Sequence, residues 1–237
     1  MNKETYLGVD VTPLSYSEIL SSLKERMDQQ LKSTIIAVNP EKIIAANKDP
    51  QLMDLINSST YQIPDGVGVL LASKMVKGKV QSRVTGVDMM DRLLEFAAQH
   101  GYRVFMYGAK EEVVSEAKRK IEEKYPAITI AGYENGYVKD HEALVKRIND
   151  VQADILFVAM GSPRQELWIR EHMDKLNVRV YQGVGGSFDV FSGNVKRAPE
   201  AFRKLGLEWF YRLATQPSRF KRQLALPKFL LKVLAKR

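Results

Sequence analysis

Short apolar runs alternate with longer amphipathic segments along most of the chain. The apolar runs are rich in β-branched residues, which is typical of buried strands, and they lie at Thr34–Val38, Arg103–Tyr107, Ile128–Ala131, Ile155–Met160 and Val178–Gln182. The stretches between them have helical spacing of apolar positions: Glu41–Ile56, Met89–His100, Glu111–Lys124, Asp140–Asp150 and Pro163–Leu176. This alternation predicts a Rossmann-like α/β fold, with a mostly parallel sheet and flanking helices.

The pattern changes near Asn194–Pro199. Beyond this point the chain is helical in pattern, basic and aromatic, so we expect an α/β core over residues 1–195 and a basic helical C-terminal appendage over residues 196–237. In its last stretch, helical spacing puts lysines on one face and four apolar residues on the other. The apolar residues are Phe229, Leu230, Val233 and Leu234. Such a helix could lie on a membrane surface, pack on the body or mediate self-association.

The composition of the 237 residues is that of a soluble globular protein, with 45% hydrophobic and 27% charged residues. Disorder, collagen and coiled coil are therefore excluded for most of the chain. The absence of cysteine excludes disulfides, thiolate metal sites and thiol nucleophiles. No apolar run approaches the ~20 residues of a membrane-spanning helix, and the first ten residues lack the apolar centre of a signal peptide. We expect no segment that spans a bilayer.

The formal net charge of +8 is unevenly distributed. Residues 196–237 contain 12 Lys and Arg against two Glu, a net charge of +10, whereas the rest of the chain has a net charge of −2. A near-neutral body with a strongly basic end indicates an anionic partner there, which could be nucleic acid, a phosphorylated ligand or an acidic membrane surface.

Polar or glycine-rich turns follow the predicted strands. In parallel α/β sheets, ligands bind at the carboxyl ends of the strands. Five turns occupy such positions: Asn39–Lys42, Pro64–Gly68, Gly108–Ala109, Gly161–Glu166 and Gly183–Asp189. We expect these turns to converge on one active-site rim.

The glycine-rich turn at Gly183–Asp189 is suited to phosphate binding. Its small residues would let backbone N–H groups approach a phosphate closely, but it lacks the Lys-Ser/Thr ending of a P-loop. Taken alone it is equally consistent with a tight turn between strand and helix. Together with the basic C-terminal end, it favours a ligand that carries a diphosphate.

Asp65 and Arg83 are the charged candidates for chemistry. Asp65 could act as a general base, although Pro-Asp-Gly is also an ordinary turn sequence. Arg83 could bind an anionic substrate group or pair with Asp88 or Asp91. The three histidines share no metal-ligand spacing and the chain has no Asp-x-Asp element, so we expect no metal.

Taken together, these turns resemble the WecG/TagA/CpsF glycosyltransferase family, glycosyltransferase family 26. The motifs that carry the resemblance run in order along nearly the whole chain: Asn39-Pro40-Glu41, Pro64-Asp65-Gly66-x-Gly68, Arg83-x-x-Gly86, Tyr107-Gly108-Ala109, Gly161-x-Pro163-x-Gln165-Glu166, the segment 183–193 (GVGGSFDVFSG), Arg197-Ala198-Pro199 and Glu208-Trp209-x-x-Arg212.

The resemblance is strongest to members that make the linkage disaccharide of wall teichoic acid. It implies an inverting, metal-independent enzyme that needs no cofactor. Such an enzyme transfers N-acetylmannosamine from its UDP form to N-acetylglucosaminyl-diphospho-undecaprenol. Alternatives are a related transferase using UDP-glucose or UDP-N-acetylmannosaminuronic acid, and a non-catalytic protein that binds nucleotide or nucleic acid. No known nucleic-acid-binding motif supports the last of these.

The resemblance also implies roles for single residues. Asp65 is the expected base for the acceptor hydroxyl, with Asn39, Arg83 and Gln165 lining the substrate pocket. The nucleotide is expected to bind to one loop and to three arginines of the appendage: Gly183, Gly185, Gly186, Ser187 and Asp189, with Arg212, Arg219 and Arg222. The chain departs from related sequences at Ala37, where they commonly have a threonine assigned to substrate contact.

The same resemblance implies where the protein works. The acceptor is a lipid of the cytoplasmic leaflet, so we expect a cytoplasmic protein that binds peripherally to the inner face of the cell membrane through the basic appendage. Because family members self-associate in solution, we also expect a homo-oligomer.

Overall fold

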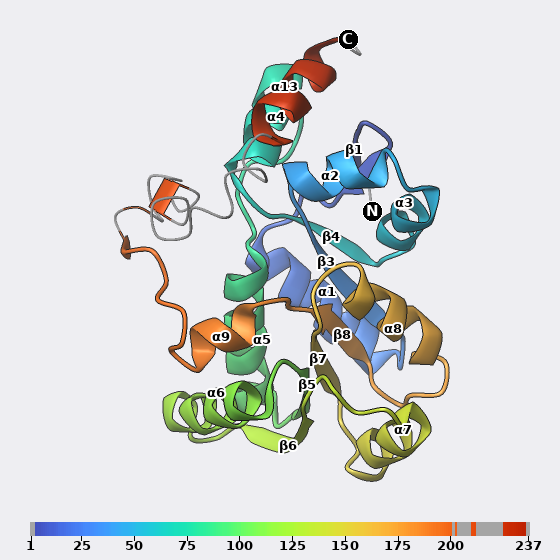
Figure 1. The fold of residues 1–237 in the computed structure, drawn as a ribbon, viewed down its shortest axis with the longest axis vertical. Helices are drawn as coiled ribbons and strands as arrows, with labels where there is room; N and C mark the ends of the chain where they lie inside the picture. The colour runs from blue at the N-terminus through green and yellow to red at the C-terminus, as the bar shows by residue number, and fades with distance from the viewer. Residues whose placement is uncertain (1–2, 201, 203–209, 212–224, 236–237) are drawn as a thin grey trace.

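The computed structural model describes residues 3–200, 202, 210–211 and 225–235. At its centre is a six-stranded sheet in the order β4-β3-β8-β7-β5-β6, in which every neighbouring pair is parallel (Figure 1). The strands are β3 (Ser33–Val38), β4 (Tyr61–Pro64), β5 (Arg103–Gly108), β6 (Thr129–Glu134), β7 (Ile155–Ala159) and β8 (Val180–Gly183). The predicted α/β fold with a mostly parallel sheet is confirmed.

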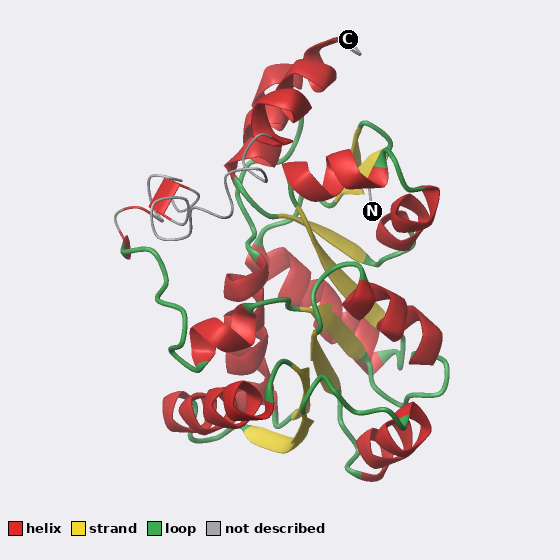
Figure 2. Ribbon diagram, in the orientation of Figure 1, coloured by secondary structure: helices red, strands yellow, loops and turns green. Residues whose placement is uncertain are grey.

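Helices connect and cover the strands (Figure 2). They are α1 (Tyr16–Asp28), α2 (Pro40–Ala46), α3 (Pro50–Asn57), α4 (Val67–Val76), α5 (Gly86–His100), α6 (Glu111–Lys124), α7 (His141–Asp150), α8 (Arg164–His172), α9 (Ser187–Phe191) and α13 (Ala225–Ala235). A short antiparallel hairpin, β1 (Glu4–Tyr6) and β2 (Val9–Val11), precedes α1. Its turn uses Leu7 and Gly8, both with positive φ.

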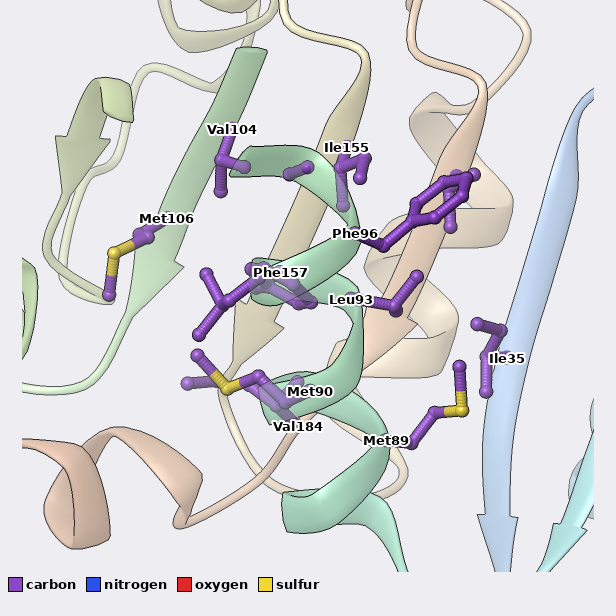
Figure 3. Close-up of a cluster of buried hydrophobic side chains, with 14 of the residues drawn as sticks. Ile35, Met89, Met90, Leu93, Phe96, Val104, Met106, Ile155, Phe157 and Val184 are labelled. Atoms are coloured by element: carbon purple, nitrogen blue, oxygen red, sulfur yellow. The ribbon is translucent and has the colours of Figure 1, made fainter. Parts of the chain in front are cut away.

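Alternate side chains of the strands pack on opposite faces of the sheet. On one face, Val104, Met106, Ile155 and Phe157 join a core formed with α1, α5 and α6. Figure 3 shows Met89, Met90, Leu93 and Phe96 of α5 turned toward these strands. On the other face, Phe105, Leu156 and Tyr181 pack with α7 and α8, while Ile36 and Val38 pack with α2 and α3. Burial on both faces explains why the central strands β5 and β7 are continuous apolar runs, whereas the edge strand β6 is only half-buried.

Two predicted helices differ from those observed. The single helix expected over Glu41–Ile56 is wrong, because Asp49 and Pro50 divide it into α2 and α3. The Asp49 carboxylate accepts hydrogen bonds from the backbone N–H groups of Gln51 and Leu52 and so begins a new helix. The helix expected over Pro163–Leu176 ends at His172, and Pro163 is its N-cap.

The helix α13 packs on the α/β body. Phe229 and Val233 are buried in the same cluster as Tyr6, Ile43 and Val69, and α13 lies beside α4 in Figure 1. The opposite side of the helix exposes Leu231 (68%) and Leu234 (45%). Of the three alternatives for this segment, packing on the body is observed for the Phe229–Val233 side.

Candidate active site

A cavity of about 700 Å³ opens at the carboxyl ends of β4, β3, β8 and β7. Four of the five predicted turns line it. They bring together the following predicted site residues: Asn39, Asp65, Arg83, Gln165, Gly183, Gly185, Gly186, Ser187 and Asp189. Residues as far apart in the sequence as Asn39 and Asp189 therefore share one site.

The fifth turn, Gly108–Ala109, does not line this cavity, so the expectation that all five share one rim is wrong. A Cβ added at Gly108 would lie 2.4 Å from the carbonyl oxygen of Ala159. The backbone N–H of Ala109 donates to the same oxygen at 2.8 Å. The glycine is required here because β5 and the end of β7 approach each other closely.

Asp65 stands at the start of α5, although it comes from the end of β4. The backbone N–H of Gly86, the first residue of α5, donates to Asp65 Oδ2 at 3.3 Å. This bond and the positive end of the helix dipole favour the ionised carboxylate. An ionised carboxylate at a cavity wall can accept a proton from a substrate hydroxyl.

The first turn of α5, at Thr85 and Asp88, is held in place by Tyr16 and Arg197. The backbone N–H of Thr85 donates to the Tyr16 hydroxyl at 2.8 Å. Burial raises the pKa of Tyr16, and the Asp88 carboxylate adds to the shift, so the hydroxyl remains a neutral acceptor at neutral pH. Arg197 pairs with Asp88 at 2.6 Å, which joins the start of the predicted appendage to α5.

Asn39 has a structural use as well as a place in the cavity. It is the N-cap of α2, and its Oδ1 accepts from the backbone N–H of Lys42 at 2.8 Å. The side-chain NH₂ group is then the part of Asn39 that can donate to a substrate. Ala37, which is two residues earlier on β3, also lines the cavity, so the position at which the resemblance leads us to expect a threonine lies in the site.

Gln165 connects α8 to the glycine-rich turn. Its Oε1 accepts from the backbone N–H of Gly185 at 2.9 Å, and its Nε2 donates to Glu166 Oε1 at 3.0 Å. The Ser187 hydroxyl donates to the Val184 carbonyl at 2.7 Å. Two donors that the sequence suggested for a phosphate are therefore already paired, and they hold the turn in place.

An ion pair at this site, between Lys42 and Glu166, was not predicted from the sequence. Lys42 Nζ lies 2.9 Å from Glu166 Oε1, and the two side chains are only 12% and 6% exposed. Lys42 lines the cavity, whereas Glu166 does not. Both belong to motifs singled out in the sequence, but their separation of 124 positions hides the pairing.

Three predicted nucleotide ligands, Arg212, Arg219 and Arg222, lie outside the described residues. Within the described residues, the cations that line the cavity are Lys42, Arg83 and Lys196, and the carboxylates are Glu41, Asp65 and Asp189. The same part of the chain contains no group of three His, Asp or Glu residues placed to hold a metal ion.

A second hollow of about 520 Å³ lies at the opposite end of the strands, near Asp28, Tyr102, Asp154 and Arg179. It contains none of the predicted site residues. Asp154 precedes β7, so this hollow is at the amino ends of the strands, where ligands of parallel α/β sheets seldom bind. We therefore place the active site in the cavity at the carboxyl ends.

Comparison with known proteins identifies the family. A sequence model described as "Glycosyl transferase WecG/TagA/CpsF family" matches residues 4–237. The chain belongs to this glycosyltransferase family. The cavity at the carboxyl ends of β4, β3, β8 and β7 is thus the place to seek the transferase chemistry of this WecG/TagA/CpsF member.

Two relatives within the family have a named activity. A Bacillus subtilis (strain 168) protein is 45% identical over 235 residues, which are 99% of this chain and 92% of the relative. A Bacillus spizizenii protein is 42% identical over 208 residues, 88% of this chain and 81% of the relative. Both are named N-acetylglucosaminyldiphosphoundecaprenol N-acetyl-beta-D-mannosaminyltransferase.

Proposed function

We propose that this chain transfers N-acetylmannosamine from UDP-N-acetylmannosamine to N-acetylglucosaminyl-diphospho-undecaprenol, with inversion and without a metal. The observation that carries the proposal is the convergence of Asn39, Asp65, Arg83, Gln165 and the turn Gly183–Asp189 on one cavity. The identity of 45% and 42% to two relatives whose name gives this acceptor and this sugar supports the choice of substrates.

The proposed mechanism is a single displacement. Asp65 accepts the proton of the acceptor hydroxyl while the hydroxyl oxygen forms a bond to the anomeric carbon of the donor. The bond from that carbon to the diphosphate oxygen breaks, and UDP leaves with the electron pair. Attack from the face opposite the leaving group inverts the anomeric centre, which agrees with the beta product in the relatives' name.

Cationic side chains would stabilise the leaving diphosphate in place of a metal ion. Arg83 lines the cavity, and Arg212, Arg219 and Arg222 are proposed to complete the set. Guanidinium groups suit this role because they bind phosphate oxygens through two parallel hydrogen bonds.

The test is UDP release from UDP-N-acetylmannosamine in the presence of a lipid-diphosphate-N-acetylglucosamine acceptor, with and without EDTA. Asp65→Asn keeps the shape of the side chain but removes the base, and we expect it to lower turnover by about 10²–10⁴-fold. The matched control is Asp150→Asn, which changes a surface ion pair of α7 with Lys146 and should leave turnover unchanged.

The outcomes separate the alternatives. Activity that resists EDTA and is lost in Asp65→Asn supports the proposal. Turnover only with UDP-glucose or UDP-N-acetylmannosaminuronic acid would keep the family and change the donor. Binding of UDP without turnover of any donor would indicate a non-catalytic protein.

We further propose that the protein works at the inner face of the cell membrane, where its lipid acceptor lies, and docks there through α13. None of the helices in the described part of the chain is both long and apolar enough to cross a bilayer. The outer side of α13 combines the exposed Leu231 and Leu234 with Lys228 and Lys232, a mixture that suits an anionic lipid surface.

Self-association in solution is also proposed, with the exposed leucines of α13 as the contact. Sedimentation velocity over a range of protein concentrations tests it. A monomer at every concentration would contradict it.

A further inference from the structure

The ion pair between Lys42 and Glu166 lies at one wall of the cavity, to which Lys42 contributes. Lys42 is on α2, which follows β3, and Glu166 is on α8, which follows β7. The strand β8 lies between β3 and β7 in the sheet. The ion pair therefore links the helices that follow the two strands flanking β8, the strand at whose end the glycine-rich turn begins.

This ion pair is not arranged for stability alone. Burial of two charges removes their hydration, and the cost is recovered only when all their hydrogen-bonding groups are satisfied. Glu166 Oε1 accepts from Lys42 and Gln165, but Glu166 Oε2 is buried with no hydrogen-bond partner in the structure. Apolar residues of similar size would hold α2 and α8 together at lower cost, so the charges need another explanation.

The position of the ammonium group provides one. Lys42 is part of the cavity wall, while Glu166 lies behind it, outside the lining. An ammonium group has three N–H donors, and Glu166 is the only partner that the described residues offer to Lys42 Nζ. The other two donors are suited to the oxygens of an anion in the cavity.

We propose that Lys42 binds a substrate diphosphate, and that Glu166 is the positioning residue that holds its ammonium group at the cavity wall. The inference rests on the proposed function, in which both the donor and the acceptor carry a diphosphate. Lys42 belongs to the α/β core, so it would act on the diphosphate in addition to the arginines of the appendage.

The experiment measures the binding of UDP and of uridine by calorimetry, which needs no turnover. Lys42→Met keeps the length of the side chain and removes its charge. We expect the variant to bind UDP at least about tenfold more weakly, a typical loss for a charge-assisted hydrogen bond, and to bind uridine as the wild type does. The matched control is Lys146→Met, which removes a lysine from a surface pair on α7 and should change neither affinity.

The Glu166→Gln variant should not lose affinity for UDP, in contrast to Lys42→Met. It leaves the ammonium group in place without its competing carboxylate, so UDP should bind as tightly as to the wild type or more tightly. A loss of UDP affinity as large as that of Lys42→Met would mean that the intact ion pair, and not the cation, is what matters, and would overturn the proposal.

The double variant Lys42→Met/Glu166→Gln separates binding from folding. Each single variant leaves one buried charge unpaired and should lower the melting temperature, whereas the double variant removes both charges and should regain most of the loss. UDP binding should remain weak in the double variant. Recovery of UDP binding together with stability would show that Lys42 acts only through the fold.

Steady-state kinetics identify which diphosphate is bound. A higher KM for the UDP-sugar in Lys42→Met indicates the donor, and unchanged UDP binding with a higher KM for the lipid acceptor indicates the acceptor; both support the proposal. Equal weakening of UDP and uridine, or no change in any of these constants, overturns it. Failure of the wild type to bind UDP would overturn the proposed function as well.

Discussion

At the scale of single residues, the structure contains polar atoms that packing leaves unsatisfied. Tyr107 is fully buried on β5 beside Trp168, with ring centroids 4.8 Å apart. Its hydroxyl has no hydrogen-bond partner in the structure. A buried hydroxyl in this state lowers stability, since its hydrogen bonds with water are lost and not replaced.

The Tyr107→Phe variant should therefore be more stable than the wild type, by about 1 kcal/mol in the free energy of unfolding. The gain should increase at alkaline pH. Burial, with a contribution from Glu134, raises the pKa of Tyr107 to about 12. Between pH 10 and 12 the unfolded chain loses this proton while the folded chain keeps it, so the wild type loses stability as pH rises.

Urea unfolding at pH 7 and pH 11 measures the difference. The control is Tyr137→Phe, at a side chain that is 70% exposed, and it should change stability at neither pH. A Tyr107→Phe variant less stable than the wild type at both pH values would show that the hydroxyl has a favourable partner.

At the scale of elements, α13 supplies part of the core. Phe229 is fully buried, and its ring meets that of Tyr6 edge to face at a centroid distance of 6.4 Å. At the start of the helix, Leu226 packs against Gly68 so closely that a Cβ at position 68 would lie 2.5 Å from it. Since Gly68 lies in the first turn of α4, three residues after Asp65, the docked helix contacts the segment next to the proposed base.

Phe229→Ala should lower the free energy of unfolding by about 3 kcal/mol, because it removes a buried aromatic ring and leaves a cavity. Leu231→Ala, on the exposed side of the same helix, should change it by less than about 0.5 kcal/mol. Chemical denaturation followed by tyrosine and tryptophan fluorescence tests both. Equal effects of the two changes would mean that α13 is not docked in solution.

Much of the element pattern could be predicted from the sequence, and the failures have physical causes. The strands β3, β5 and β7 were predictable because their largely buried residues form apolar runs, whereas the short β4 was not among the predicted strands. The helix α1 was missed although Ser15 and Glu18 form a capping box at its start, a signal that the sequence does contain. The division between α2 and α3 was likewise visible in Asp49-Pro50, since the residue before a proline disfavours helical geometry.

The site residues near the ends of strands could be predicted from the sequence. The ion pair of the site, which depends on tertiary contacts, could not. Asn39 and Asp65 directly follow β3 and β4, Gly183 ends β8, and Gln165 lies in the first turn of the helix after β7. The topology of a parallel sheet therefore brings them together. Lys42 and Glu166 pair across the helices that follow β3 and β7, the two strands on either side of β8. Nothing in the local sequence gives that strand order.

At the scale of the whole molecule, charge is separated along the chain. The residues before 196 are close to neutral, and those from 196 onward have a net charge of +10. Within the described residues of this basic part, Lys228 and Lys232 are exposed residues of α13. The helix α13 lies at the top of Figure 1, far from α7 at the bottom. The sequence therefore combines a near-neutral part before residue 196 with a strongly basic part from that residue onward.

Charge reversal of Lys228 and Lys232 to Glu should weaken binding to vesicles made of equal parts phosphatidylglycerol and phosphatidylcholine, by about 1 kcal/mol or more per residue. Reversal of Lys146 and Lys175, near α7, is the control. Binding of the wild type should fall as salt rises from 0.1 to 1 M, since the screening length shrinks from about 10 to about 3 Å. Sedimentation with the vesicles measures both; equal binding by the two charge-reversed proteins would contradict docking through α13.

The packing of α13 has a consequence for biosynthesis. The cluster that contains Tyr6 and Val9 is completed by Phe229 and Val233, so its first and last members are separated by more than 200 residues. During translation, the apolar surface formed by Tyr6, Ile43 and Val69 stays uncovered until Phe229 has left the ribosome. Exposed apolar surface of this kind is prone to aggregation, and this surface is where a chaperone would engage the nascent chain.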